Sequence, residues 1–408
     1  MGGFTGKSVY ARDGHGQNRA IDPAQARTLT GTAYHGLCAG LIWVLCCGSA
    51  SADAIRVATF NVSLGRDGPG LLERDLAKGD DPQIKTVLAI INTVRPDILL
   101  LNDFDYDYGS VALGLLAAQL EQSGLRYAHK FALRPNSGMM TTLDLDGDHR
   151  TFGPGDAQGF GDFAGSQGMA ILSRFPVLTT EVRDFSALLW KDLPGAKLPR
   201  QFDKPFPSDT AQAQQRLSSK GHWDVPVELP DGSVLHLLAS HPTPPVFDGP
   251  EDRNGLRNRD EIRFWSLYLD GAALAGFDAR APASFVILGD LNADPNDGEG
   301  SHSAISNLLA HRLVQDPLPV SRGGVDASQR QAGQNQKHTT DPSLDTVDWD
   351  ESRTPGNMRV DYVLPSSDLT VSGAGVFWPA PDQERFELVG SDGQTGSHHR
   401  LVWVDIER

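Results

Sequence analysis

The chain has 408 residues, of which 39% are hydrophobic and 22% charged, so it can form one large packed domain or two small ones, and the composition excludes disorder throughout. Its net charge of −16 disfavours a protein that grips nucleic acid by a broad clamp on the phosphate backbone. The charge does not exclude a nuclease, because a metal ion can supply local positive charge at the scissile phosphate.

The first feature along the chain is an apolar run, Gly36–Cys47, followed by the small residues Ala50–Ala52. The run is too short to span a bilayer comfortably and suits the hydrophobic region of a signal peptide with an A-x-A cleavage site. We therefore expect residues 1–52 to be a signal peptide and residues 53–408 to be exported, to the periplasm or as a secreted protein, with no transmembrane segment. The alternative is an uncleaved N-terminal anchor.

Removal of this segment changes the composition of the chain. All three cysteines are lost, so the remaining 356 residues (408 minus 52) cannot form disulfides. Four basic and two acidic residues are lost as well, which brings the net charge from −16 to near −18. The mature protein must draw its stability from its core and from any metal that it binds.

Strands and helices alternate in the next part of the chain. Apolar alternation predicts a strand over residues 55–61. Residues 80–82, Asp-Asp-Pro, predict a helix start, and residues 95–97 predict its end. The short, wholly apolar run 98–101 is typical of a central buried strand, and residues 111–122 predict a second helix.

The remainder contains more strands than helices. Residues 134–168 and 191–220 are polar, turn-rich insertions, and residues 323–355 have the same character. A helix is predicted over residues 260–273. Further strands are predicted at 168–173, 225–229, 234–240, 285–288, 360–364, 371–377 and 401–406. This mixture predicts one α+β domain with long loops at one end.

Carboxylate, amide and imidazole side chains follow several of these strands, where a sheet can gather polar groups from distant parts of the sequence. They are Asn61, Asn102, Asp103, His241, Asp290, Asn292, His398 and His399. Carboxylates and amides suit a hard cation such as Mg²⁺ or Mn²⁺. Any one of these residues alone is more often an ordinary turn residue. Asp361 is different, because an acid inside the apolar strand 360–364 is costly unless it is paired.

Five short motifs in this order resemble the endonuclease/exonuclease/phosphatase (DNase I-like) superfamily. The resemblance extends over residues 55–408. The motifs are Ala58-Thr59-Phe60-Asn61-Val62, Arg95-Pro96-Asp97-Ile98-Leu99-Leu100-Leu101-Asn102-Asp103, Gly289-Asp290-Leu291-Asn292-Ala293, Arg359-Val360-Asp361-Tyr362-Val363 and Ser397-His398-His399-Arg400. The Gly-Asp-Leu-Asn-Ala motif alone is moderately specific, and the ordered set is much more so.

The resemblance implies an α+β fold with a four-layer α/β/β/α sandwich, two packed mixed sheets flanked by helices. It also implies a divalent-metal-dependent phosphoesterase that hydrolyses a phosphate ester by in-line attack of activated water. The metal would be Mg²⁺ or Mn²⁺, with Ca²⁺ as a further option. The substrate would be a phosphomonoester, a sugar phosphate, a phospholipid head group or a nucleic acid, the last not favoured by the net charge.

The resemblance also implies roles for individual residues. Asn61 and Asp103 would help hold the metal, Asp290 would orient or deprotonate the attacking water, and Asn292 would lie beside the phosphate. Phosphate contact and charge stabilisation would come from His399.

Asp361 would orient His399, and we predict that these two side chains are hydrogen-bonded in the folded protein. His241 would be the second histidine, near the leaving group.

Two positions depart from the family pattern. The metal-binding acid after the second strand is usually Glu, whereas this chain has the shorter Asp103. The acid that usually precedes the final histidine is replaced by His398. Loss of that carboxylate puts a second metal position in doubt or favours a softer ion such as Mn²⁺ or Zn²⁺, with His398 as a ligand.

One further segment, residues 247–261, is dense in polar side chains. Arg253, Asn254 and Asn258 could contact a substrate phosphate. The alternative is that the segment is the solvated start of a helix. The alternative to the whole functional hypothesis is a catalytically inactive binding module that keeps the fold.

Overall fold

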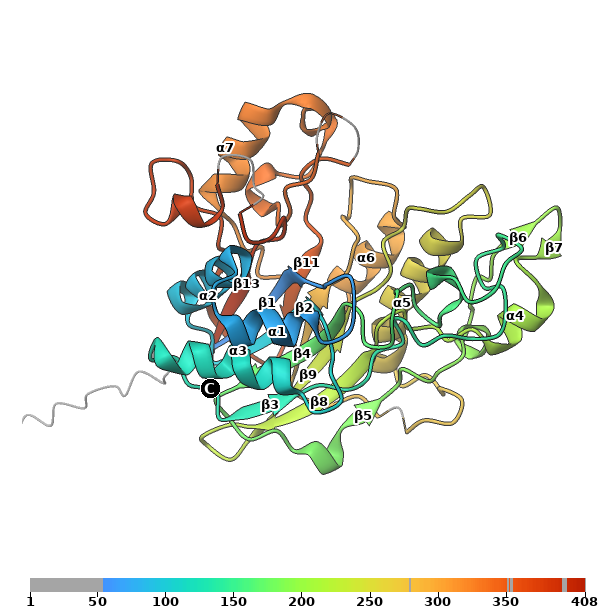
Figure 1. Cartoon of the computed structure of the whole chain (residues 1–408), viewed down its shortest axis with the longest axis horizontal. Coiled ribbons are helices and arrows are strands. Elements are labelled where there is room, and N and C mark those ends of the chain that lie inside the picture. Colours follow the sequence, from blue (N-terminus) through green and yellow to red (C-terminus); the bar gives the residue numbers. More distant parts are fainter. Residues whose placement is uncertain (1–53, 279, 351, 353–354, 391–394, 408) are drawn as a thin grey trace, which may run out of the picture. The chain divides into compact units, whose positions relative to one another are not determined.

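The structure is a computed structural model that describes residues 54–407 except 279, 351, 353–354 and 391–394 (Figure 1). These residues belong to one compact unit, Ser51–Arg408. The predicted signal peptide lies outside the described residues. Within the described part of the chain, no helix is both long enough and apolar enough to cross a membrane.

The first sheet has six strands in the order β12-β13-β1-β2-β4-β3. β1 and β2 are parallel, and β13 and β4 run antiparallel to them on either side. The bounds are β1 Ile55–Leu64, β2 Ile98–Phe104, β3 His129–Phe131, β4 Gly168–Ser173, β12 Thr370–Val376 and β13 Val402–Glu407.

The second sheet has five strands in the order β11-β10-β9-β8-β5. β9 and β10 are parallel, and β11 and β8 are antiparallel to them. The bounds are β5 Arg183–Asp184, β8 His222–Glu228, β9 Val234–Ser240, β10 Phe285–Asp290 and β11 Asp361–Pro365.

The two sheets pack face to face, and helices cover their outer faces. Alternate residues of each strand point to opposite faces, so Val57 packs between the sheets whereas Ala58 packs against helices. The first sheet is covered by α1 (Leu71–Lys78), α2 (Pro82–Val94) and α3 (Val111–Gln122), which lie together in Figure 1. The second is covered by α5 (Arg253–Leu269) and α6 (His302–Leu309). The predicted four-layer α+β sandwich is therefore confirmed.

The predicted helices and strands agree best with the structure where the local sequence signals are strong. α2 begins at Pro82, and its N-cap Asp81 accepts a hydrogen bond from the Ile84 amide at 2.9 Å. α3 and β4 have the predicted bounds. The helix predicted to begin at residue 260 begins instead at Arg253, because the polar side chains of its first two turns are buried against loops and give no apolar periodicity.

Several short elements were not predicted. α1 and α6 are eight residues each, and α7 (Arg322–Gln331) occupies part of the stretch predicted to be turn-rich. The second insertion contains a hairpin of β6 (Arg200–Gln201) and β7 (Lys204–Pro205), followed by α4 (Asp209–Gln214). The single turns of 3₁₀ helix are Pro154–Asp156, Thr179–Glu181, Trp190–Asp192, Gly333–Lys337, Pro342–Leu344 and Phe386–Leu388.

Candidate active site

The candidate site lies at the edge of the sandwich where the parallel strands of both sheets end. Asn61 in β1 is paired in register with Asn102 in β2, and Asp290 at the end of β10 is paired with Asp361 at the start of β11. His241 follows β9 directly, and His399 lies three residues before β13. Strand register therefore brings residues far apart in sequence to one place.

Asp290 is the centre of this group and is 1% exposed. The Asn61 amide nitrogen donates to the Asp290 carboxylate at 3.0 Å and to the Asp103 carboxylate at 3.2 Å. The Nε2 atoms of His241 and His399 lie 3.3 Å and 3.7 Å from the same Asp290 oxygen. Burial raises the pKa of Asp290, but the two histidines outweigh this effect and lower the pKa to about 2, so Asp290 is ionised at neutral pH.

The predicted pairing of Asp361 with His399 is present. His399 Nδ1 donates to Asp361 Oδ2 at 2.9 Å, and the Thr346 hydroxyl donates to the same oxygen at 2.9 Å. The ring of Trp349 meets the His399 ring edge-on, with centroids 5.5 Å apart. These contacts fix the orientation of His399, and they leave Nε2 facing Asp290.

The charges of this pair follow from their surroundings. Burial raises the pKa of Asp361 to about 6, although His399 opposes the rise. Burial lowers the pKa of His399, but the Asp361 and Asp290 carboxylates outweigh it and raise that pKa to about 9. At neutral pH the site therefore contains a protonated imidazole between two carboxylates.

A second set of side chains faces Asp103. The Nδ1 atom of His241 lies 3.6 Å from the Asp103 carboxylate, beyond a hydrogen bond, and this buried atom has no hydrogen-bond partner among the described residues. Lys220, which is 8% exposed, places its ammonium nitrogen 3.9 Å from the same carboxylate. Burial lowers the pKa of Lys220. The sequence analysis did not single out Lys220, although its place just before β8 is the available signal, because β8 begins where β9 ends.

The residues present fit a divalent cation. The carboxylates of Asp103 and Asp290 both lie within hydrogen-bond distance of the Asn61 side chain, so two carboxylates and an amide face one space. Asp290, Asp361 and His399 also offer ligand atoms within 4.8 Å of one another, and one oxygen of Asp361 is buried with no hydrogen-bond partner in the described structure. Oxygen donors of this kind suit Mg²⁺, Mn²⁺ or Ca²⁺.

His398 does not join this group. It is half-buried, and its Nδ1 donates to the Asp348 carbonyl oxygen at 2.8 Å. Among the residues that the structure describes, the histidine that shares ligand distances with Asp290 and Asp361 is His399. The ligand role predicted for His398 stays a prediction.

The other predicted contacts are divided between two locations. Asn292 is 6% exposed, and its amide donates to the Pro242 carbonyl at 3.0 Å, which joins the loops after β10 and β9. Arg253 and Asn254 line a cavity, where they donate to the carbonyls of Leu145 and Val246. Asn258 is completely buried and donates to two backbone carbonyls, so the structure does not place it to contact a phosphate.

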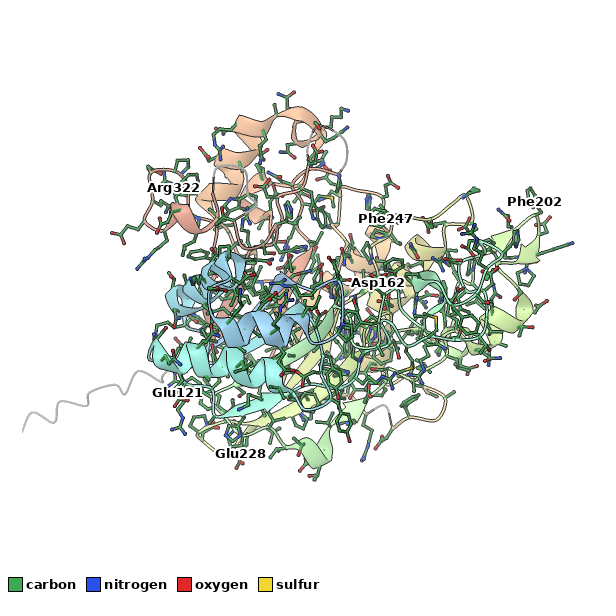
Figure 2. The ribbon with its side chains drawn as sticks, in the orientation of Figure 1. Glu121, Asp162, Phe202, Glu228, Phe247 and Arg322 are labelled. Atoms are coloured by element: carbon green, nitrogen blue, oxygen red, sulfur yellow. The ribbon has the colours of Figure 1, made fainter. Side chains whose placement is uncertain are left out.

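The cavity begins at the site and has a volume of about 980 Å³. Asp103, Lys220 and His241 line it together with both insertions. Its wall carries two exposed aromatic residues, Phe160 and Phe247, of which Phe247 is labelled in Figure 2. The acidic residues of the wall are Asp144, Asp146, Asp148, Asp248 and Glu251.

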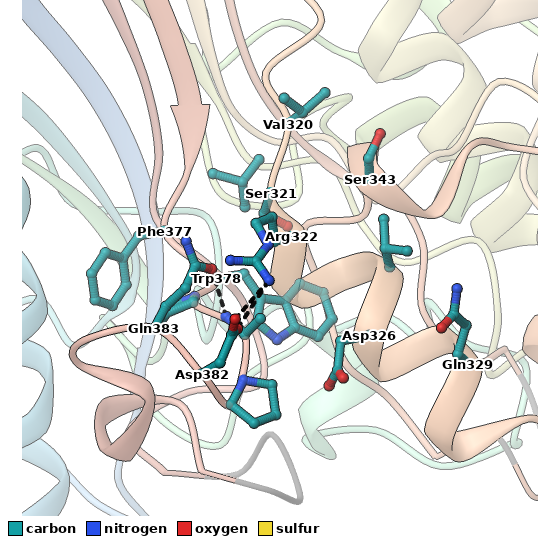
Figure 3. Close-up of a pocket in the computed structure, with 15 residues that line it drawn as sticks. Val320, Ser321, Arg322, Asp326, Gln329, Ser343, Phe377, Trp378, Asp382 and Gln383 are labelled. Atoms are coloured by element: carbon teal, nitrogen blue, oxygen red, sulfur yellow. Dashed lines mark hydrogen bonds and ion pairs between the residues drawn. The ribbon is translucent and has the colours of Figure 1, made fainter.

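A second pocket, of about 950 Å³, lies between α7 and the segment after β12 (Figure 3). Arg322 pairs with Asp382 across it at 2.9 Å, and Trp378 contributes to its lining. None of the candidate site residues lines it. We therefore assign the chemistry to the strand-end site and its cavity.

Comparisons with known proteins give one family. The family model described as Endonuclease/Exonuclease/phosphatase family matches residues 58–392. A comparison with curated proteins finds no match.

Solved structures similar to this chain include an endonuclease/exonuclease/phosphatase from Beutenbergia cavernae, with 19% identity, coverage of 87% of this chain and 71% of that chain, and a TM-score of 0.48. Sphingomyelinase C from Streptomyces griseocarneus has 15% identity, coverage of 86% and 99%, and a TM-score of 0.45. Beta toxin from Staphylococcus aureus, solved with bound magnesium ions, has 14% identity, coverage of 87% and 100%, and a TM-score of 0.44.

Proposed function

Because the chain belongs to the endonuclease/exonuclease/phosphatase family, we propose that it is a divalent-metal-dependent phosphoesterase that hydrolyses a phosphate ester by in-line attack of water. The observation that carries this proposal is the arrangement of Asp290 beside a His399 ring that Asp361 holds at 2.9 Å. This arrangement supplies an ionised acceptor for the attacking water and a fixed cation for the phosphate.

Each side chain has a part that follows from its charge. Asp290, with a pKa of about 2, is ionised and can accept a hydrogen bond from the water and orient it. His399, with a pKa of about 9, is protonated and can donate from Nε2 to a phosphate oxygen as negative charge develops there. The carboxylate of Asp361 stabilises that cation and keeps the ring from turning.

A cation held by Asn61, Asp103 and Asp290 would neutralise charge on the phosphate. Lys220 and His241 lie on the Asp103 side of the same space and line the cavity. Their nitrogens can donate to the phosphate or to the departing oxygen. We assign His241 to the leaving group, because its Nδ1 is buried without a hydrogen-bond partner in the described structure.

The cavity favours a compact substrate. Six acidic side chains, Asp103 included, outnumber Lys220, Arg253 and Arg257 on its wall and oppose a polyanion. A small phosphomonoester, a sugar phosphate or a phospholipid head group fits the volume of about 980 Å³. A nucleic acid is the less favoured substrate. The competing hypothesis, an inactive binding module, requires loss of turnover despite this arrangement.

The experiment is a hydrolysis panel with bis(4-nitrophenyl) phosphate, 4-nitrophenyl phosphate, sphingomyelin, DNA and RNA, each with Mg²⁺, Mn²⁺ or Ca²⁺ and with chelator. Turnover that the chelator abolishes supports the proposal. No turnover of any substrate with any of these ions would favour the inactive binding module.

Asp103→Asn tests the metal directly. Asp103 has a positive φ of 52°, which Asn tolerates, so the variant removes the charge without straining the backbone. We expect about 10²–10³-fold less activity and a higher metal concentration for half-maximal activity. The matched control is Asp107→Ala, just after the end of β2, since Asp107 accepts a hydrogen bond from the Val111 amide of α3 at 2.7 Å and should change stability alone. Equal losses in both variants would contradict the metal role of Asp103.

We also propose that the enzyme is exported, on the basis of the apolar run Gly36–Cys47 and the A-x-A site after it. Mass spectrometry of the protein from its native host should find an N-terminus near Asp53. Recovery of a cytosolic chain that still carries residues 1–52 would contradict export.

A further inference from the structure

One face of α5 carries buried polar side chains at positions where the rest of the helix is apolar. Arg257, Asn258 and Glu261 are all buried, and they fall within an arc of about 100° around the helix axis. The next turn of the helix contributes Ile262, Trp265 and other apolar residues to the core against the second sheet. A charged pair and an amide at a helix–sheet boundary are costly to bury, so their contacts must offset that cost.

Glu261 makes the most informative contacts. Its Oε1 accepts hydrogen bonds from the Ser219 amide at 2.6 Å and from the Ser219 hydroxyl at 2.8 Å. Its Oε2 accepts a hydrogen bond from the Thr243 amide at 2.8 Å. One carboxylate therefore joins the segment just before Lys220 to the loop that follows His241.

The neighbouring side chains extend the same arrangement. Asn258 donates to the carbonyls of Thr243 at 2.9 Å and Leu291 at 3.0 Å, so the His241 loop is also joined to the loop after Asp290. Arg257 donates to the carbonyl of Leu217 at 2.9 Å and to that of Ser218. Burial raises the pKa of Glu261, and Arg257 opposes this rise.

We infer that Glu261 is a positioning residue, which sets the distance between the two groups that reach the site from loops, Lys220 and His241. This inference rests on the proposed function. Lys220 lies two residues before β8 and His241 directly after β9, so the pairing of these strands brings the two segments near each other, and the contacts of Glu261 hold them beyond the strand ends. The Ser219 hydroxyl also lies 3.1 Å from the His241 carbonyl oxygen, so a shift of the Ser219 segment would move His241 as well.

The test is Glu261→Gln, which keeps the volume of the side chain but replaces one acceptor oxygen with an NH₂ group. That group faces a backbone N–H, either of Ser219 or of Thr243, and one of the two loops is released. The matched control is Asp260→Asn. Asp260 is equally buried on the same helix, but its carboxylate accepts from Trp190 Nε1 at 2.8 Å and the Lys197 amide at 2.7 Å, which hold the second insertion.

We expect Glu261→Gln to lower kcat on bis(4-nitrophenyl) phosphate by up to about 100-fold at temperatures well below its Tm, with a smaller change in KM. Asp260→Asn should lose a similar amount of stability and keep its kcat. We also expect the loss in Glu261→Gln to be larger for phenyl than for 4-nitrophenyl esters, because the poorer leaving group depends more on His241. Equal kcat losses in the two variants, or wild-type kcat in Glu261→Gln, would overturn the inference.

A second measurement does not depend on turnover. Imidazole ¹H–¹⁵N spectra, assigned with His241→Gln, should show a displaced His241 signal in Glu261→Gln and an unchanged one in Asp260→Asn. An unchanged signal in Glu261→Gln would overturn the positioning role. An inactive wild type with the displaced signal would contradict the proposed function and leave the positioning role standing.

Discussion

The two halves of the candidate site are positioned in different ways. Strand register pairs Asp290 with Asp361, and the packing of the two sheets brings Asn61 and His399 to them. Lys220 and His241 lie in segments joined to α5 by hydrogen bonds between buried side chains and the backbone. The sheets hold the first half in place. The position of the second half depends in addition on a few hydrogen bonds to α5.

The difference bears on how each half can fail. A substitution in the strand-borne half, at Asp290, Asp361 or His399, removes a charge from the reacting centre but leaves the positions of the other groups unchanged. The chemical step is then impaired, whereas substrate binding is largely kept. A change in the supports of the loop-borne half keeps the charged groups of Lys220 and His241 themselves and alters the distance between them. Variants that separate these outcomes test whether the division is real.

The largest effect is expected in the strand-borne half. His399→Ala and Asp361→Asn should each lower kcat by about 10²–10⁴-fold with a smaller effect on KM, because a fixed cation stabilises the transition state more than bound substrate. The double variant should lose far less than the product of the two single losses, since Asp361 acts through His399. Steady-state kinetics of the three variants measure this coupling.

The chain offers a matched control for that coupling. His236 pairs with the buried Asp224 at 2.5 Å in the second sheet, near the strand ends remote from the site, where His236 is in register with Phe285 at the start of β10. His236→Ala should cost stability and leave kcat unchanged. Full additivity of Asp361→Asn and His399→Ala would show that the two residues do not act as a unit.

A smaller effect is expected on the free energy of unfolding, from a residue next to the loop-borne half. His222 lies next to this half, where Ser218 Oγ donates to its Nδ1 at 2.7 Å and its Nε2 donates to the Glu261 carbonyl at 2.9 Å. The bond accepted by Nδ1 requires the neutral ring, whereas the bond donated by Nε2 is kept by either form. Burial lowers the pKa of His222 to about 4, so the unfolded chain, with a pKa near 6.5, binds a proton first as pH falls.

His222 therefore contributes stability that is present above pH of about 6.5 and is lost as pH falls towards 4, by at most about 3 kcal/mol. Urea unfolding of the wild type and His222→Gln at several pH values measures the contribution. The variant should be less stable at pH 7 and should lose less free energy of unfolding between pH 6.5 and 4. If the free energy of unfolding fell equally with pH in the two proteins, this assignment would be contradicted.

The sequence predicted the strand-borne half well, and for a physical reason. Asn61, Asp290 and Asp361 stand next to short apolar runs. The parallel strands β9 and β10 end at one edge, and the antiparallel β11 begins beside the end of β10, so local pattern and topology give the same answer. The Asp361–His399 bond was predicted from the cost of an unpaired acid in an apolar strand, together with the family resemblance.

The loop-borne half was predicted poorly. The start of α5 lies seven residues before the predicted start because Arg257, Asn258 and Glu261 contact loops far away in the sequence and leave no apolar repeat. Lys220 was missed because the strand after it was predicted to begin at residue 225, whereas β8 begins at His222, so its place next to a strand was not seen. Asn258 was assigned to substrate on its polarity, whereas its burial and its two carbonyl partners are visible only in the folded chain.

The smallest effect is expected at His398, the residue before His399. The Asp348 carbonyl accepts its Nδ1 proton at 2.8 Å, and a ring held in this way can still offer Nε2 to a cation as its neutral tautomer. The structure places His399, and not His398, within ligand distance of Asp290 and Asp361, so we expect His398→Ala to lower kcat only a few-fold, about 1 kcal/mol. The concentration of Mn²⁺ for half-maximal activity should stay that of the wild type. A ligand that replaces the family's missing acid would behave differently, because its loss would raise that concentration by about 10–100-fold, as the loss of even an outer metal contact commonly does. Activity measured against Mg²⁺, Mn²⁺ and Zn²⁺ concentration in the wild type and in His398→Ala distinguishes the two outcomes, and a raised requirement confined to the softer ions would place His398 on the metal.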